Sequence, residues 1–147
     1  MELDYLHFRS DQAGSGLCSC ASDTRIHLQP LIAAFNQKHN LTIGSSELVI
    51  LEGAQLVEAT QLLEHELVDL IDNHHVDADP TGFGRKAVCI TILDRSLILN
   101  DFSCTTDQII SRLNGIWKVF DHTVQAAGRV SVYGTDTVTA ADIMPRK

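Results

Sequence analysis

With 147 residues, 44% of them hydrophobic and 20% charged, the chain has the size and composition of one globular domain, expected to span residues 1–147. Its formal net charge of −8 disfavours nucleic-acid binding, because affinity for a phosphate backbone comes from clustered Lys and Arg. No apolar run approaches the roughly 18 to 20 residues that cross a bilayer, and acidic residues stand where a signal peptide carries basic ones, so we expect a cytoplasmic protein without a membrane segment.

The N-terminal part of the chain predicts a strand followed by a long loop. Residues 3–8, with the sequence LDYLHF, alternate weakly between apolar and polar side chains, which indicates a strand. Residues 9–23 are rich in Gly, Ser and Asp and show no periodicity. We therefore expect a long loop there, of the kind that is often either functional or poorly ordered.

Residues 24–40 have two interpretations. Asp23 or Thr24 could cap a helix whose apolar face carries Leu28, Leu31, Ile32 and Phe35. Pro30 would then lie past the first turn, where it removes a hydrogen bond and clashes with the preceding turn. We prefer a helix that begins near Pro30 and ends at Asn40, and we leave open whether residues 24–40 are one helix or a strand plus a helix.

The middle of the chain predicts a buried strand and a long amphipathic helix. Residues 46–53 contain a short β-branched apolar run that Gly53 closes, which indicates a strand. From Ala54 to Asn73 apolar residues recur at three- and four-residue steps, which predicts one buried helical face. That face carries Leu56, Ala59, Leu63, Leu67, Leu70 and Ile71.

A turn and a hairpin follow. Pro80, Gly82 and Gly84 indicate a turn. Two apolar runs at residues 86–93 and 97–102 flank the break Asp94-Arg95-Ser96, which fits a tight β-hairpin.

The last predicted elements are a helix and a strand. Thr105 with Gln108 forms a capping box, and Gly128 provides a stop, around a helix at 106–127. The inward face of that helix carries Ile109, Leu113, Ile116, Trp117, Phe120, Val124 and Ala127. Residues 129–134, RVSVYG, predict a final strand, and the tail beyond it has no assigned structure.

This succession of elements predicts the fold class. Several strands and three helices in one small chain indicate an α+β fold, a two-layer sandwich with about three helices packed on a mainly antiparallel sheet. The elements alternate too irregularly to require a parallel, doubly wound sheet.

The segment HELVDLIDNHHVDAD, residues 65–79, is the densest collection of metal-binding side chains in the chain. His65 and Asp69 lie four residues apart on the helix, a spacing that brings two ligands to one point. The full candidate set for ligand or metal binding is His65, Asp69, Asp72, His74, His75, Asp77 and Asp79. Such side chains suit Zn²⁺ or, with carboxylates alone, Mg²⁺ or Mn²⁺.

We nevertheless interpret most of this segment as a solvated helix end. At about 1.5 Å rise per residue, His74 would lie about 13 Å from His65 along the axis if the helix continued. Ligands of one zinc ion must each lie within about 2.0 to 2.3 Å of it. A bound divalent metal is therefore possible and not favoured, and the residues indicate no other cofactor.

The predicted loop at 9–23 holds the second candidate group, Cys18 and Cys20 with Arg25 just beyond it. The segment lacks the Lys of a nucleotide-binding phosphate loop. Its cysteine-to-arginine spacings also miss the five intervening residues that a cysteine phosphatase needs. The two thiols could bind a soft metal or form a redox pair, but we prefer a loop with two incidental cysteines, reduced in a reducing compartment.

Taken together, these patterns favour a small acidic binding domain for a protein partner or a small ligand. The acidic surface would suit a basic protein through complementary potential. One alternative is a small metal-dependent hydrolase that uses the His and Asp side chains of residues 65–79. Another is a homodimeric structural or assembly protein that pairs through an exposed strand, for which 129–134 is the candidate.

Overall fold

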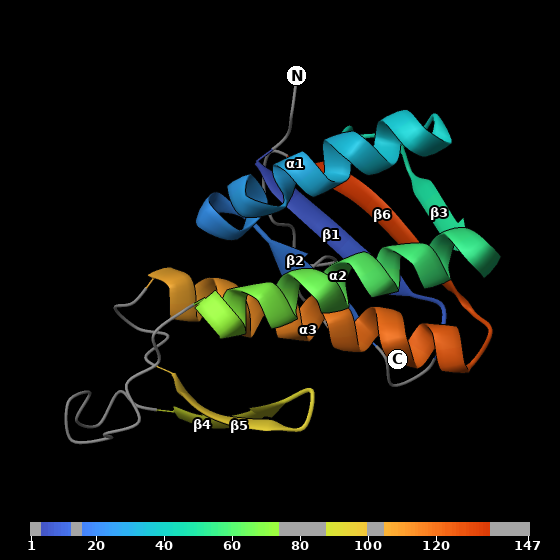
Figure 1. Ribbon diagram of the computed structural model, residues 1–147. Coiled ribbons are helices and arrows are strands. Elements are labelled where there is room, and N and C mark those ends of the chain that lie inside the picture. The colour runs from blue at the N-terminus through green and yellow to red at the C-terminus, as the bar shows by residue number, and fades with distance from the viewer. Residues whose placement is uncertain (1–3, 13–15, 74–87, 100–104, 136–147) are drawn as a thin grey trace.

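The computed structural model describes residues 4–12, 16–73, 88–99 and 105–135 (Figure 1). The elements in chain order are β1 Tyr5–Ser10, β2 Leu17–Cys20, α1 Ser22–His39, β3 Val49–Glu52, α2 Gly53–Asn73, β4 Val88–Ile92, β5 Arg95–Leu99, α3 Thr105–Gln125 and β6 Arg129–Thr135. Three helices pack against a mainly antiparallel sheet, which confirms the predicted α+β sandwich.

The main sheet has four strands in the order β2-β1-β6-β3, and the pairs between these strands are antiparallel. Because side chains alternate along a strand, one face presents Leu6 and Phe8 of β1 beside Val130 and Val132 of β6. These four side chains are buried, and α1 and α2 cross this face (Figure 1). Strand β6 lies inside the sheet, so residues 129–134 do not form the exposed edge expected for dimer pairing.

Strand β2 occupies part of the segment predicted as a loop at 9–23. Leu17–Cys20 pairs with β1, with Phe8 opposite Cys18 and His7 opposite Ser19. The strand is only four residues long and follows a Gly- and Ser-rich stretch, so its local signal is weak. Pairing with β1, rather than local propensity, determines its conformation.

Helix α1 begins at Ser22, so the predicted start at Pro30 is wrong. Proline inside a helix costs about 3 kcal/mol or more. Burial of Leu28 and Phe35 on either side of it offsets this, since each large apolar side chain contributes about 1.5 to 3 kcal/mol. Pro30 has no N–H to donate to the carbonyl of Ile26, four residues earlier. Both residues are exposed, so water can reach that carbonyl. The predicted end at Asn40 is confirmed, because Asn40 caps the helix in the left-handed conformation at φ 54°.

Helix α2 follows β3 without a loop, because Gly53 adopts a φ of +58° that turns the chain at once. Its predicted apolar face is buried against the sheet and α3, apart from Leu70, which is half-buried. Thr60 also lies on the buried face, where its hydroxyl donates to the carbonyl of Leu56 at 2.7 Å.

Helix α3 ends at Gln125, two residues before the predicted end. Ala127 therefore does not belong to the inward face: it is exposed and adopts a φ of 53° in the turn to β6. Ile110, which the predicted face omitted, is fully buried, and Trp117 is half-buried at the margin of the core.

Strands β4 and β5 form the predicted hairpin, as a two-stranded sheet of their own. Leu93 and Asp94 both have positive φ at its turn, at 48° and 66°, as a two-residue hairpin of the primed type requires. Ile92 and Leu99 are buried and join the hairpin to the core. The predicted turn at 80–84 and the tail after residue 135 lie outside the described residues. Across the described helices, none is long and apolar enough to span a membrane.

The core position of α3 gives a stability prediction. Leu113 is fully buried, so Leu113→Ala should lower the free energy of unfolding by about 2 to 5 kcal/mol. Trp117→Ala should fall short of the roughly 3 to 5 kcal/mol of a fully buried aromatic, because Trp117 is half-buried and its indole N–H finds no acceptor among the residues that the structure describes. Urea unfolding of the two variants measures both losses. A larger loss of unfolding free energy for Trp117→Ala than for Leu113→Ala would contradict the assignment of Leu113 to the centre of the core and of Trp117 to its margin.

Candidate functional site

The described members of the His and Asp segment lie on the surface of α2. His65, Asp69 and Asp72 are exposed, and Asp72 forms an ion pair with Arg95 on β5. His74, His75, Asp77 and Asp79 lie outside the described residues. Within the described ranges, no three His, Cys, Asp or Glu side chains come together as a metal site. This part of the segment therefore presents a polar surface.

Cys18 and Cys20 are structural thiols on β2. Both are free, and they lie two residues apart on one face of the strand. Burial raises the pKa of Cys18, while burial and then the neighbouring Cys18 raise the pKa of Cys20 to about 12. Both are protonated at neutral pH, whereas a nucleophile or metal ligand must be a thiolate. Arg25 is buried near Cys20 and donates to Gln29 at 2.5 Å.

His7 forms a polar cluster that the sequence did not suggest. Its Nδ1 lies 2.7 Å from the hydroxyl of Ser19 and its Nε2 lies 2.8 Å from the hydroxyl of Thr135. A serine beside a histidine is also the arrangement of a nucleophile and its base. His7 is fully buried, so no substrate reaches it. These hydrogen bonds join β1 to β2 and β6.

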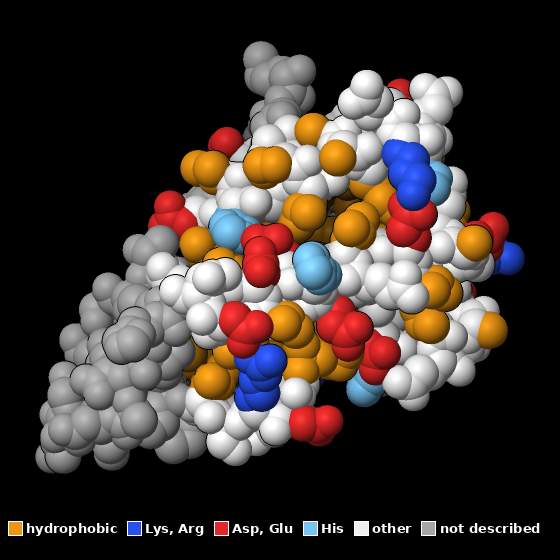
Figure 2. Space-filling model, in the orientation of Figure 1, with side chains coloured by type: hydrophobic (Ala, Val, Ile, Leu, Met, Phe, Trp, Pro, Cys, Tyr) orange, Lys and Arg blue, Asp and Glu red, His pale blue; other side chains and the backbone are white. Residues whose placement is uncertain are grey.

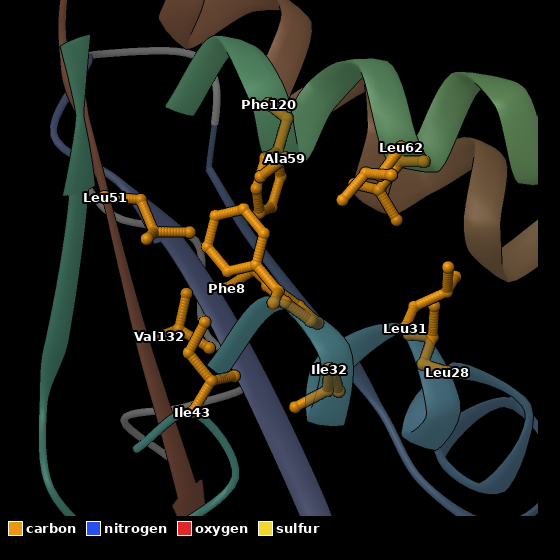
Figure 3. A pocket seen from close by; sticks show the side chains of 12 residues that line it. Phe8, Leu28, Leu31, Ile32, Ile43, Leu51, Ala59, Leu62, Phe120 and Val132 are labelled. Atoms are coloured by element: carbon orange, nitrogen blue, oxygen red, sulfur yellow. The ribbon is translucent and has the colours of Figure 1, made fainter. Parts of the chain in front are cut away.

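A pocket opens between α1 and α2, above the sheet. Figure 2 shows a hollow between the two helices with hydrophobic side chains around its rim. In Figure 3, side chains of the sheet and of α3 form the floor, and side chains of α1 and α2 form the walls. The lining consists of Phe8, Leu28, Leu31, Ile32, Phe35, Ile43, Leu51, Ala59, Leu62, Leu63, Phe120 and Val132.

The pocket is a narrow slot. The space free of protein atoms is about 490 Å³, a figure that includes open solvent at the mouth. The cavity volume of its enclosed part is only about 60 Å³. Every lining side chain is hydrocarbon, so the slot offers burial of apolar surface and no group for acid, base or nucleophilic chemistry.

Matching stripes on the two helices produce this site. On α1, His27, Leu31, Phe35 and His39 follow one another at four-residue steps. On α2, Glu58, Leu62 and Glu66 do the same. Residues four apart lie on one helical face, so each helix presents an apolar middle with polar residues one turn beyond it.

The polar ends of the stripes pair across the pocket. His39 Nε2 lies 2.6 Å from one carboxylate oxygen of Glu58, and Lys38 Nζ donates to the other at 2.9 Å. At the opposite end, His27 Nε2 lies 2.7 Å from a carboxylate oxygen of Glu66. Helices α1 and α2 therefore run antiparallel, with one His–Glu pair toward each end of the slot.

The spacing of the pairs along each helix shows which segments of α1 and α2 lie beside the slot. The two pairs enclose about 18 Å of α1, from His27 to His39, and about 12 Å of α2, from Glu58 to Glu66, at about 1.5 Å per residue. Between the pairs, α1 packs more closely on α3 and β1 than on α2. The polar pairs thus join the helices where their apolar stripes leave a gap.

The sequence interpretation missed these residues for a definite reason. It concentrated on His65, Asp69 and Asp72, which face solvent, whereas Glu58 on the same helix faces α1. The start assigned at Pro30 also left His27 and Leu28 outside any helix. The available signal was the four-residue repeat of His, Leu, Phe and His on α1, opposite Glu, Leu and Glu on α2.

Comparison with protein-family models, with curated proteins and with solved structures finds no match for this chain. Any inference about the function must therefore come from the physical chemistry of the slot.

The Glu58 contacts predict how stability depends on pH. The hydrogen bond from His39 and then that from Lys38 lower the pKa of Glu58 below its ordinary value of 4.5. A depressed carboxyl pKa stabilises the fold above the ordinary value, and that stabilisation is lost as the pH falls through the folded pKa. The loss of unfolding free energy on acidification below 4.5 should therefore be smaller in Glu58→Gln than in the wild type.

Urea unfolding from neutral pH into the acid range measures this dependence. Glu64→Gln, at an exposed glutamate of the same helix, is the matched control and should follow the wild-type curve. Identical acid profiles for Glu58→Gln and the wild type would mean that Glu58 carries no stabilising contact.

Proposed function

We propose that the protein binds a small apolar molecule in the slot between α1 and α2. The observation that carries this proposal is a surface-open pocket lined by twelve hydrocarbon side chains. Ligand sites are typically concave and mostly apolar. The lining of the slot exposes apolar surface to water. A ligand that covers this surface lowers the free energy by roughly 25 cal/mol for each Å² removed from water.

The shape and lining of the slot support an elongated aliphatic ligand. Three of its side chains are Phe and the other nine are aliphatic, so no polar group within the lining fixes an orientation. A flexible hydrocarbon chain can lie along the space between the two His–Glu pairs, which enclose about 12 Å of α2.

The other predicted functions receive less support from the described residues. The residues of α2 that would serve a metal-dependent hydrolase point into solvent, and Asp72 pairs with Arg95. The strand assigned to dimer pairing is interior. A basic protein partner and a cytoplasmic location remain predictions from composition.

Filling the slot tests the proposed function. N-phenylnaphthylamine, an uncharged fluorescent probe, should bind the wild type saturably and be displaced by dodecanol. Ala59→Leu places a larger side chain in the lining and should weaken probe binding by about tenfold or more, or about 1.4 kcal/mol. Ala33→Leu makes the same change at an exposed position of α1 and should leave the affinity unchanged.

A second matched pair introduces a charge. Leu62→Asp puts a carboxylate at the mouth and should weaken probe binding, because an apolar ligand cannot compensate its desolvation. Ile26→Asp changes an apolar residue of α1 that is 71% exposed and does not line the slot. Equal probe affinity in Ala59→Leu, Leu62→Asp and the wild type would show that the probe binds elsewhere, and the proposed function would be wrong.

A further inference from the structure

We propose that the floor of the slot selects ligands by the length of the hydrocarbon end that they insert. The inference rests on the proposed function for what enters the slot, and it adds a chemical class, molecules that end in a short unbranched alkyl tail. Three buried side chains of the floor, Phe8, Phe120 and Val132, form what we call the stop. The tail would enter between α1 and α2 and end against this stop.

The lining of the slot changes from exposed to buried between its mouth and its floor. Leu62 at the mouth is 36% exposed, and Leu31 and Ile32 on the facing helix are half-buried. The three side chains of the stop are at most 5% exposed. In Figure 3 they lie on the side of the sheet and of α3, away from the mouth. A chain end that enters at the mouth therefore reaches the stop last.

The side chains of the stop are held in place by their neighbours. Phe8 and Val132 lie opposite each other on β1 and β6, the two central strands of the sheet. Cys18 and Val49 lie next to them on the outer strands, so each is flanked on both sides. The ring of Phe120 meets that of Phe8 edge-on, with centroids 5.6 Å apart. Because close-packed interiors resist deformation, the stop should keep its position when a ligand enters.

The volume of the enclosed part gives the length of the tail. A water-sized group needs about 10 to 15 Å³, so the enclosed 60 Å³ holds about four to six carbon atoms. Each methylene that moves from water into this space should raise the affinity about fourfold. Further carbons would lie at the open mouth, partly in water, and should add less. The affinity should therefore rise steeply with chain length up to a break and more slowly beyond it.

Displacement of N-phenylnaphthylamine by straight-chain alcohols, from butanol to dodecanol, measures this dependence. Val132→Ile adds a methylene to the stop, so the break should move to a chain about one carbon shorter. Val130→Ile makes the same change at a fully buried valine on the same face of the same strand, outside the lining. This control should keep the break of the wild type.

A second pair of variants changes the stop in the opposite direction. Phe120→Leu makes the stop smaller and should move the break to a longer chain. Ile116→Val makes a fully buried side chain of α3 smaller outside the lining, and it should leave the break unchanged. Loss of stability alone cannot move the break in both directions. If either change to the stop leaves the break where its control has it, the inference is wrong.

Xenon separates the stop from the proposed function, because it tests the enclosed space without a chain-like ligand. Xenon enters dry apolar cavities, and methyl NMR under xenon pressure reports where it binds. The methyl groups of Leu51 and Ala59, which line the slot, should respond saturably in the wild type. Val132→Ile should weaken this xenon binding several-fold, and Val130→Ile should not.

The two kinds of failure are therefore distinguishable. If xenon behaves as expected but no alcohol displaces the probe, the stop holds and the proposed binding of an aliphatic ligand is wrong. Equal xenon affinity in Val132→Ile and Val130→Ile overturns the stop whether or not the alcohols bind.

Discussion

The pairing of α1 with α2 through two His–Glu contacts is the constraint on which the candidate site depends. Helices that pack directly bring their apolar ridges together. Here long polar side chains join the helices at both ends of the shared stripe, while small Ala59 and the branched side chains between the pairs leave space unfilled. Protein interiors normally close such gaps, because lost packing contacts reduce stability. An open slot of this composition is the basis of the proposal that the protein binds another apolar molecule.

The rest of the fold supports that arrangement. Strands β1, β6 and β3 supply the apolar floor with Phe8, Val132 and Leu51, and α3 closes the space below with Phe120, whose ring contacts Phe8 edge-on at 5.6 Å between centroids. The His7 ring and Cys20 are buried and Cys18 is half-buried, and these groups strengthen the core and the strand pairing. Reactive chemistry at these groups is thus suppressed, while the apolar surface of the slot remains open.

The fold was largely predictable because its strongest signals are local. The apolar repeats of α2 and α3 and the alternation of β6 give the elements and most of the core. Strand β2 was not predictable, since Leu17–Cys20 gains its conformation from β1. The first half of α1 was one of two open interpretations, and the preferred start at Pro30 was wrong because burial of Leu28 and Phe35 offsets the cost of the proline. The slot was missed because it depends on two helices meeting, and neither stripe alone identifies a site. Concentrated His and Asp residues drew attention to the surface end of α2 instead.

Methyl NMR during a titration with dodecanol tests the central claim most directly. The account predicts saturable chemical-shift changes at the methyl groups of Leu31, Ala59 and Leu62, which line the slot. The apolar side chains exposed elsewhere, Ile26, Leu48 and Ile50, should not respond. Changes that grow without saturation and spread over Ile26, Leu48 and Ile50 would show adsorption to exposed apolar surface, and would contradict a ligand site between α1 and α2.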